Sequence, residues 1–526
     1  MKKSVGIAVG LVVAAGAVVT GGAWYTGTKL EPVLNTSISD ANKELKALLP
    51  GTGITPSLEL VSLERGFFSS TARYRLKVAG KLNGDEGTPV DGELLFVDHM
   101  EHGPFPLSRL VSLKWLPVMA KSNFELEKTP LVEKWFAATK GSSPLTGTTN
   151  LGYNQDVTGT LQFQPVEITE AEGTLKFSGM EFDVAVADDK KQVDVEGRMD
   201  SLVFTAPDKT HVEFSGLSLV NNSELGASGL YLGTSESSLK QIQVTLPEQQ
   251  PLLIKDLLQK GHLSEGSAGI AGGFTYDVGS FNYAGKDIGS MKMAGSLKNL
   301  DIAAVKSLVD LYKELLGKLE AANYDAANPS FDLTPEQKTK LEADLGTLLA
   351  GKPVLALDNL AFKTANGESS FKLSLGLNKP TSFELPPQEM ATQILASLDA
   401  RLAVSKLMIK DVVLTKAVLD PSADPAAVAQ EAEQMSEMAG MMAVSTQMAT
   451  VEGNDIVSSV KYADGQVDFN GNKMPLEQFI GMMAAMAPGA AAGMPGADAD
   501  AQYEGEEAES GITDESDESA ETEEAE

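Results

Sequence analysis

A run of 25 residues near the amino terminus, from Ser4 to Thr28, contains no charged side chain. As a helix it would be roughly 37 Å long, enough to cross a hydrocarbon core of about 30 Å. Lys2 and Lys3 precede it, and basic residues that flank a first span stay in the cytoplasm. The sequence therefore predicts one transmembrane helix in residues 1–28, in contact with the bilayer through residues 4–25, with a cytoplasmic amino terminus and the bulk of the chain exported.

A cleaved signal peptide is the alternative interpretation of this run. Such peptides have a shorter apolar region that ends at a small-residue cleavage site. The one Ala-x-Ala candidate, Ala15 to Ala17, lies inside the apolar run, and Trp24 and Tyr25 stand where an aromatic belt would meet the outer interface. These features favour an uncleaved anchor, which places the protein in a bacterial inner membrane with most of its chain in the periplasm.

The composition narrows the classes of partner and site. The chain has no Cys, which suits an oxidising compartment and excludes disulfides and thiol catalysis. Its formal net charge is -31, and 14 of the acidic residues lie between Asp498 and Glu526. A chain of this charge repels nucleic acid and anionic headgroups, so neither is expected to bind through a basic patch. Residues 488–526 are predicted to be a disordered acidic tail.

The hydrophobic pattern divides the remaining chain. Residues 29–50 predict an amphipathic stalk helix, residues 51–300 a mainly β region of period-two segments, and residues 301–487 an α+β region that continues the sheet. A weak repeat, Phe177 to Phe182 and Phe214 to Leu219, suggests a sheet that grows by adding hairpins. Helices are expected at 305–319, 334–348, 389–402, from 425 and at 475–487. The fold class is thus α+β and β-rich: an extended antiparallel curved sheet with packed helices, preceded by one transmembrane helix.

The segment from Asp98 to His102 and the corner that follows it have the most unusual composition. Two imidazoles three residues apart, with carboxylates between them, could ligate a transition metal. A helix would be needed to bring both rings to one face, and the segment Gly103, Pro104, Phe105, Pro106 prevents one. A structural loop, with His102 bonded to a backbone group, is the favoured interpretation.

Two further stretches are candidates for structure or binding. Arg65, Gly66, Phe67 and Phe68 place two aromatic residues after a turn glycine. They either cap the open end of the sheet core or gate a ligand.

Ten of the 19 Met residues follow residue 434. At Met435, Met438 and Met442 the helical spacing favours packing against the sheet. An adaptable surface for a partner or an acyl chain, and a copper(I) site, are the alternatives.

Motif searches give no catalytic or cofactor site. The chain lacks Gly-x-Ser-x-Gly, His-Glu-x-x-His, the phosphate-binding Gly-x-x-x-x-Gly-Lys-Ser/Thr and Gly-x-Gly-x-x-Gly. We therefore expect a protein that is not an enzyme and that needs no cofactor or metal.

Several segments resemble the YdgA-like family of bacterial envelope proteins. They are Gly21 to Gly27, Arg65 to Ser70, Glu101 to Leu107, Ser397 to Ala400, Tyr462 to Gln466, Asn470-Gly471, and Met474 to Phe479. The resemblance implies a single-pass inner-membrane protein that faces the periplasm and has no assigned activity, and it supplies no catalytic residues. The acidic tail departs from the family pattern.

These observations lead to a functional hypothesis. A membrane-anchored protein with a long one-faced sheet could bind an apolar ligand, such as a lipid acyl chain, or an envelope partner on its apolar face. The alternative is a structural or scaffolding protein with a filled core and no ligand. The sequence also leaves a homo-oligomer open.

Overall fold

The computed structural model describes residues 38–39, 41–43, 45, 54–66, 69–82, 88–102, 106–154, 156–187, 191–319, 333–419 and 422–486. The apolar run 4–28, most of the expected stalk and the tail 488–526 lie outside these residues. The chain divides into a large unit, Met1–Leu476, and a small unit, Glu477–Glu526. In the small unit the structure describes α10, which begins one residue earlier (Leu476–Met486).

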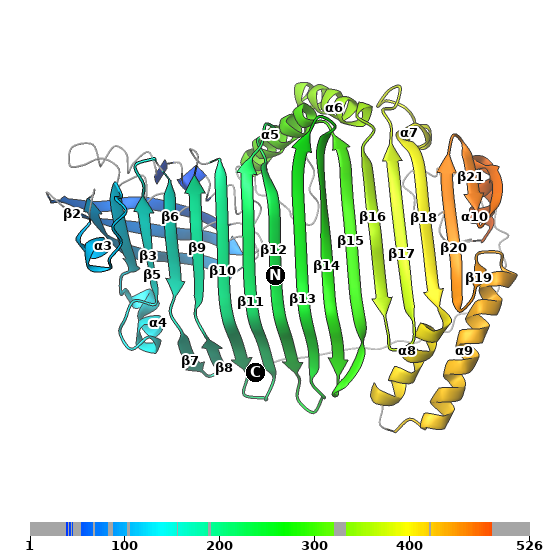
Figure 1. Ribbon diagram of the computed structural model, residues 1–526, viewed down its shortest axis with the longest axis horizontal. Helices are drawn as coiled ribbons and strands as arrows, with labels where there is room; N and C mark the ends of the chain where they lie inside the picture. The colour runs from blue at the N-terminus through cyan, green and yellow to red at the C-terminus, as the bar shows by residue number, and fades with distance from the viewer. Residues whose placement is uncertain are drawn as a thin grey trace, which may run out of the picture. The chain divides into compact units, whose positions relative to one another are not determined.

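The described strands of the large unit form one antiparallel sheet with 22 members (Figure 1). Their bounds are β1 (Ile54–Arg65), β2 (Ser69–Leu82), β3 (Thr88–His102), β4 (Ala120–Leu126), β5 (Leu145–Leu151), β6 (Val157–Phe163), β7 (Val166–Glu170), β8 (Gly173–Phe177), β9 (Met180–Ala187), β10 (Gln192–Thr205), β11 (His211–Leu225), β12 (Tyr231–Thr245), β13 (Leu252–Gly266), β14 (Gly269–Tyr283), β15 (Lys286–Leu300), β16 (Val354–Lys363), β17 (Glu368–Leu377), β18 (Leu395–Ser405), β19 (Thr450–Glu452), β20 (Asp455–Ala463), β21 (Gln466–Phe469) and β22 (Asn472–Pro475).

Nearly every strand pairs with its neighbour in the chain. β1 to β6 follow one another across the sheet, β9 lies beside β6, and β10 to β18 continue in order to β20, β21 and β22. β7 and β8 prolong the β6–β9 hairpin beyond a break at Pro165 and Gly179, and β10 pairs with both β9 and β8. The expected antiparallel meander is confirmed, and the sheet is not closed.

The helices of the large unit are inserted between strands. Their bounds are α3 (Leu107–Val111), the short 3-10 helix η1 (Pro130–Val132), α4 (Glu133–Ala138), α5 (Ile302–Leu319), α6 (Pro335–Ala350), α7 (Pro387–Ile394), α8 (Lys406–Leu419) and α9 (Pro425–Ser445). α5 and α6 lie at one end of the central strands, whereas α8 and α9 form a pair at the opposite end of β17 and β18 (Figure 1). The capping box expected at Thr334 is present: the Thr334 hydroxyl accepts from the Gln337 N–H, and the Gln337 side chain accepts from the Thr334 N–H.

One sequence prediction in this region is wrong. The helix expected over 389–402 ends at Ile394, and Leu395 to Leu402 belong to β18. The alternation of Leu398 and Leu402 with Asp399 and Arg401 fits a strand, and its pairing with β17 and β20 outweighs local helix propensity. The helix α8 was not expected.

Residues 38, 39, 41–43 and 45 are helical, within the segment expected to be the stalk. Ile38, Ala41 and Leu45 are buried against Leu58 and Tyr74 of β1 and β2. Among the described helices, none is long and apolar enough to traverse a bilayer.

Candidate functional site

One face of the sheet is apolar across its central strands. A row of direct neighbours on six successive strands illustrates it: Leu217, Leu239, Leu257, Val278, Met291 and Phe362. A second row continues it to β18: Tyr276, Met293, Leu360, Phe371 and Leu402. A third row contains Leu297, Leu355, Leu375 and Leu398. We call these residues, with Phe274, the apolar face.

The opposite side of the same strands is polar. Lys292, Lys363, Lys372 and Arg401 alternate with members of the apolar face along β15 to β18. Side chains of a strand point alternately to the two sides of a sheet, so this period-two pattern separates the two chemistries. The sequence prediction of one apolar and one solvated face is confirmed for these strands.

A line of irregular pairing crosses β11 to β14 without interrupting the apolar face. One residue on each of these strands has no direct partner on the neighbouring strand. These residues are Gly216 on β11, Lys240 on β12, Asp256 on β13 and Gly279 on β14. Gly216 has φ +68° and Asp256 φ +52°, so the backbone there is locally left-handed. Apolar residues beside this line are three positions apart rather than two, as in Phe214 and Leu217.

The ring of Phe281 shows the effect of this irregularity. It lies three residues after Val278, yet its centroid is 6.1 Å from that of Phe362, a member of the apolar face. An uninterrupted strand would have placed Val278 and Phe281 on opposite sides. The irregularity therefore keeps apolar side chains of both halves of the strand on one side.

The apolar face is continuous with the buried core around β4 to β10. The row Ala72, Asp98, Phe124, Gly147, Leu161, Phe182, Gly197 and Leu219 runs directly across the sheet from β2 to β11. Phe124, Leu161, Phe182 and Val195 form the core cluster, against which Leu219 packs. A Cβ added at Gly197 would lie 2.9 Å from the Phe182 ring, so the glycine makes room for that aromatic side chain.

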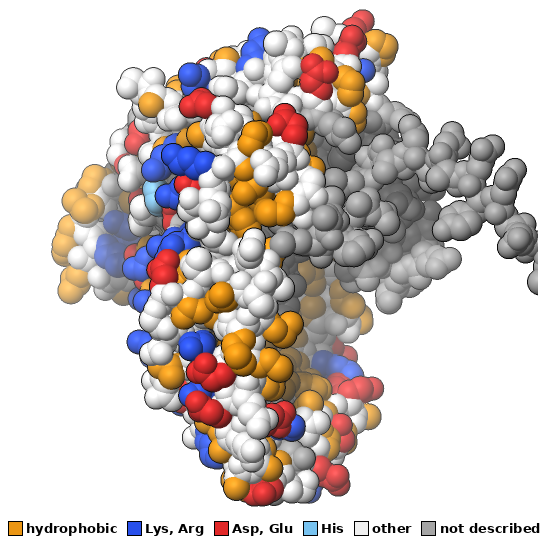
Figure 2. Space-filling view, turned by 90° about the vertical axis from the view of Figure 1, so that its right-hand side faces the viewer, with side chains coloured by type: hydrophobic (Ala, Val, Ile, Leu, Met, Phe, Trp, Pro, Cys, Tyr) orange, Lys and Arg blue, Asp and Glu red, His pale blue; other side chains and the backbone are white. Residues whose placement is uncertain are grey.

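Coverage of this side decreases along the sheet. Near β1 to β3 the helical residues Ile38, Ala41 and Leu45 bury it, whereas beyond β10 much of it remains half-buried. Phe274, Leu355, Leu360 and Leu402 are 39%, 41%, 37% and 42% exposed. Among the described residues, the main helix contacts in this part are those of α7 and α8 with β17 and β18. Figure 2, viewed from the side of the last strands, shows hydrophobic side chains gathered in a band beside charged ones.

Asp98 is a buried carboxyl group in the row described above. Its side chain is fully buried, and its Oδ1 accepts a hydrogen bond of 2.6 Å from the Ser122 hydroxyl. Its Oδ2 and the hydroxyl of Tyr74 have no hydrogen-bond partner among the described residues. Burial raises the pKa of Asp98 to about 7, against a smaller lowering by Ser122, and burial together with Asp98 raises the pKa of Tyr74. Asp98 is therefore neutral in mildly acidic solution.

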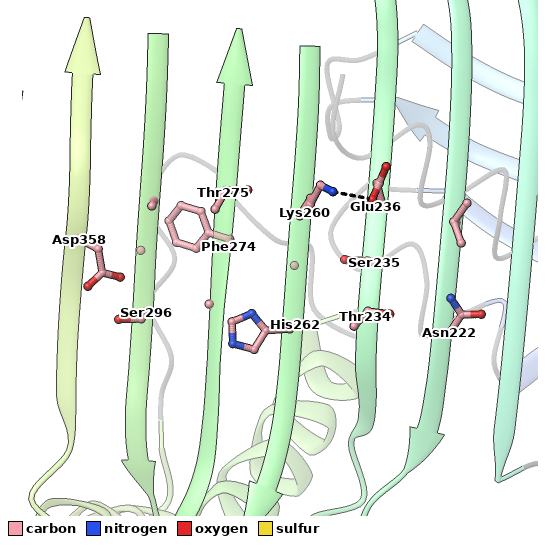
Figure 3. Close-up of a pocket in the computed structure, with 15 residues that line it drawn as sticks. Asn222, Thr234, Ser235, Glu236, Lys260, His262, Phe274, Thr275, Ser296 and Asp358 are labelled. Carbon is pink, nitrogen blue, oxygen red and sulfur yellow. Dashed lines mark ion pairs between the residues drawn. The ribbon is translucent and has the colours of Figure 1, made fainter. Parts of the chain in front are cut away.

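A hollow of about 710 Å³ lies on the sheet between β11 and β16 (Figure 3). Gly273 pairs with both His262 and Ser296, and its missing side chain leaves space that the His262 ring leans across. Lys260 pairs with Glu236 at 3.0 Å, and both side chains are about half exposed. Such a pair contributes little energy and satisfies its own charges, and the polar side chains around it offer hydrogen bonds to a small polar molecule.

The structure places His102 and its neighbours differently from the sequence prediction. Asp98 to His102 belong to β3 rather than to a loop. His102 points to the buried side and its Nε2 lies 3.1 Å from the Ser70 hydroxyl, whereas His99 is exposed beside Thr71. The partner of His102 is thus a side chain and not a backbone group. A strand sends residues 99 and 102 to opposite sides, which keeps the two imidazoles apart.

The remaining corner residues are partly described. Arg65 ends β1, the Gly66 N–H donates to the Ser69 carbonyl at 2.7 Å, and Pro106 is fully buried. Phe67, Phe68, Gly103, Pro104 and Phe105 lie outside the described residues.

The expected packing of the methionines is wrong. Met435, Met438 and Met442 are 41%, 51% and 60% exposed. The buried residues of α9 are instead Val428, Ala432, Ser436 and Gly440, one every four positions. This row of small side chains lets α8 approach closely, and it displaces the longer Met side chains to the outside. In the part of the chain that the structure describes, no three His, Asp or Glu side chains are grouped to hold a metal ion.

Comparison with known proteins gives relatives but no activity. The sequence profile of a family described as "Bacterial protein of unknown function (DUF945)" matches residues 1–477. Protein YdgA of Escherichia coli (strain K12) is 30% identical over 495 residues, 92% of this chain and 97% of that protein. The uncharacterized protein YihF of the same organism is 24% identical over 487 residues, 90% and 97% of the two chains. No solved structure matches this chain.

Proposed function

We propose that this chain, which belongs to the bacterial DUF945 family, is a single-pass inner-membrane protein that holds lipid acyl chains on its apolar face in the periplasm. The observation that carries the proposal is the apolar face, which extends over β11 to β18 while several of its large side chains stay more than a third exposed. An exposed apolar surface of this kind marks a site of interaction with a protein or a lipid.

The chemistry of the face favours an acyl chain over a polar ligand. Its rows contain aliphatic, aromatic and thioether side chains, which provide contact without directional hydrogen bonds. A flexible hydrocarbon chain gains about 0.8 kcal/mol of binding free energy for each buried CH₂ group. Contact with a few neighbouring rows of the apolar face would therefore be enough to bind it.

The competing function is that of a scaffold whose apolar face is covered by protein. Native mass spectrometry of the detergent-purified protein, followed by lipid extraction, separates the two functions. We expect co-purified phospholipid at a defined stoichiometry. A protein that is free of lipid, or a dimer whose contact shields the apolar face, would favour the scaffold.

A variant pair sharpens this experiment. Leu360→Gln with Leu402→Gln makes the exposed part of the apolar face polar, and we expect much less lipid to co-purify. Lys363→Gln with Arg401→Gln changes the opposite side of the same two strands and should leave the amount of lipid unchanged. Equal loss from both variants would contradict binding at the apolar face.

The membrane anchor has its own test. Because Ser4 to Thr28 lacks a suitable cleavage site, we expect the intact mass of the protein in the membrane fraction to include the anchor. Protease added to spheroplasts should digest the bulk of the chain. A mature protein that has lost the apolar run would contradict the anchor.

A further inference from the structure

An exposed apolar loop connects β3 to β4. Val111, Leu113, Trp115 and Leu116 are 77%, 72%, 66% and 78% exposed, among the highest values for the large hydrophobic side chains of the described residues. Leu113 also has φ +57°, in the left-handed region. Four large apolar side chains within six residues form a patch that is costly to leave in water.

Polar contacts hold this loop in place at its base. Arg109 donates from Nη1 to the Asn150 side-chain oxygen and from Nη2 to the Leu116 carbonyl, both at 3.0 Å. The Ser108 N–H donates to the Glu101 carboxylate at 3.0 Å, and Lys121 donates to the Ser108 hydroxyl at 2.9 Å. The base is therefore fixed to β3, β4 and β5, so the apolar side chains are presented outward.

The charge around the loop is opposite to that of the whole chain. Residues 102–124 contain no Asp or Glu and three basic residues, Arg109, Lys114 and Lys121, in a chain of net charge -31. Tryptophan, leucine and lysine together are the composition of segments that enter a membrane interface, where the ring sits at headgroup level and the amine meets phosphate.

The position of the loop in the chain puts a bilayer within reach. Ile38 packs in one cluster with Met100, two residues before the end of β3. Ten Cα steps separate Thr28, the end of the apolar run, from Ile38, and they span at most about 35 Å. A helix anchored in residues 4–28 would thus tether β1 to β3 near the membrane surface.

We propose that Val111 to Leu116 insert into the outer interface of the bilayer that residues 4–28 cross. This contact rests on the proposed anchor but not on lipid binding at the apolar face. It gives the protein a second point of attachment, which orients β1 to β5 on the membrane.

Single-tryptophan proteins test the contact in full-length chains, because the chain has three Trp residues. Trp24→Phe with Trp135→Phe leaves Trp115 as the reporter. The protein is reconstituted into phosphatidylcholine vesicles with brominated or unbrominated acyl chains, since bromine quenches only nearby indoles. We expect brominated lipid to reduce Trp115 emission strongly, and Leu113→Ser with Leu116→Ser in the same background to restore it.

Two matched reporters separate the outcomes. Trp135, half-buried and stacked on Phe163 at 6.5 Å, should stay bright when it is the remaining Trp. Trp24 alone reports the anchor. Quenched Trp24 with bright Trp115 would overturn the loop contact while the anchor stands, and quenched Trp115 alone would support the loop without the anchor. If Trp115 emission instead changes with protein concentration and does not respond to brominated lipid, the loop contacts a second copy of the chain, and the proposal is overturned.

Discussion

Asp98→Asn should stabilise the protein by as much as about 4 kcal/mol at pH 8 and by only roughly 1.6 kcal/mol at pH 5. The pKa of Asp98 rises to about 7 in the folded chain from an ordinary value of 3.8. The folded state therefore binds more protons than the unfolded state between these values, so stability falls as the pH rises from about 4 to 7 and is flat above. A shift of about three units at roughly 1.4 kcal/mol each gives the expected magnitude.

Denaturant unfolding of both proteins at pH 5 and pH 8 measures this effect. Asparagine stays neutral, so the variant should lose the fall in stability that the wild type shows across this range. Asp91→Asn on the exposed side of the same strand is the matched control and should change neither value much. A wild-type protein with equal stability at the two pH values would contradict a buried carboxyl of raised pKa.

Phe182→Ala should have the largest effect of any single truncation on this face. Its ring is 1% exposed and lies at the centre of the cluster with Phe124, Leu161 and Val195. Removal of a buried aromatic ring loses its transfer energy and leaves a cavity, which together cost about 3 to 5 kcal/mol. We expect a loss of that size in the free energy of unfolding.

Leu360→Ala is the control for this prediction, because it lies on the same face where coverage is poor. Its side chain is 37% exposed, and truncation should cost only about 1 to 2 kcal/mol. In lipid-free protein the two costs should differ clearly. Added phospholipid should stabilise the wild type more than Leu360→Ala. Equal costs in lipid-free protein would mean that the apolar face is as well packed as the core.

The sequence predicted the sheet because its signal is local. The alternation of Val212 and Phe214 or of Leu373 and Leu375 with polar neighbours specifies strands with one apolar side, and consecutive hairpins need no long-range information. The repeat at Phe177 and Phe214 proved informative in a different way. Gly179 and Gly216, the third residue of each copy, both have positive φ and mark the irregular line in neighbouring parts of the sheet.

The features of the candidate site could not be predicted in the same way, because they depend on which residues of other strands and helices lie beside them. Asp98 drew attention only as a neighbour of two histidines, because its burial results from the residues that β2 and β4 place beside it. The Met residues of α9 were predicted to lie on the buried side of the helix, but they lie on the exposed side. Helical periodicity alone did not distinguish the Met stripe from the row of small residues that is buried. Small side chains at Ala432, Ser436 and Gly440 were the signal that could have identified the contact with α8.

The order of the strands also has a consequence for how the chain folds. From β10 to β18 each strand pairs with the one just before it, and most of the loops that join these strands are short, so the entropy cost of closing them is low. A hairpin can dock as soon as it has been synthesised, on the edge left by its predecessor. Synthesis order and assembly order then coincide, and each new hairpin covers the edge that would otherwise invite aggregation.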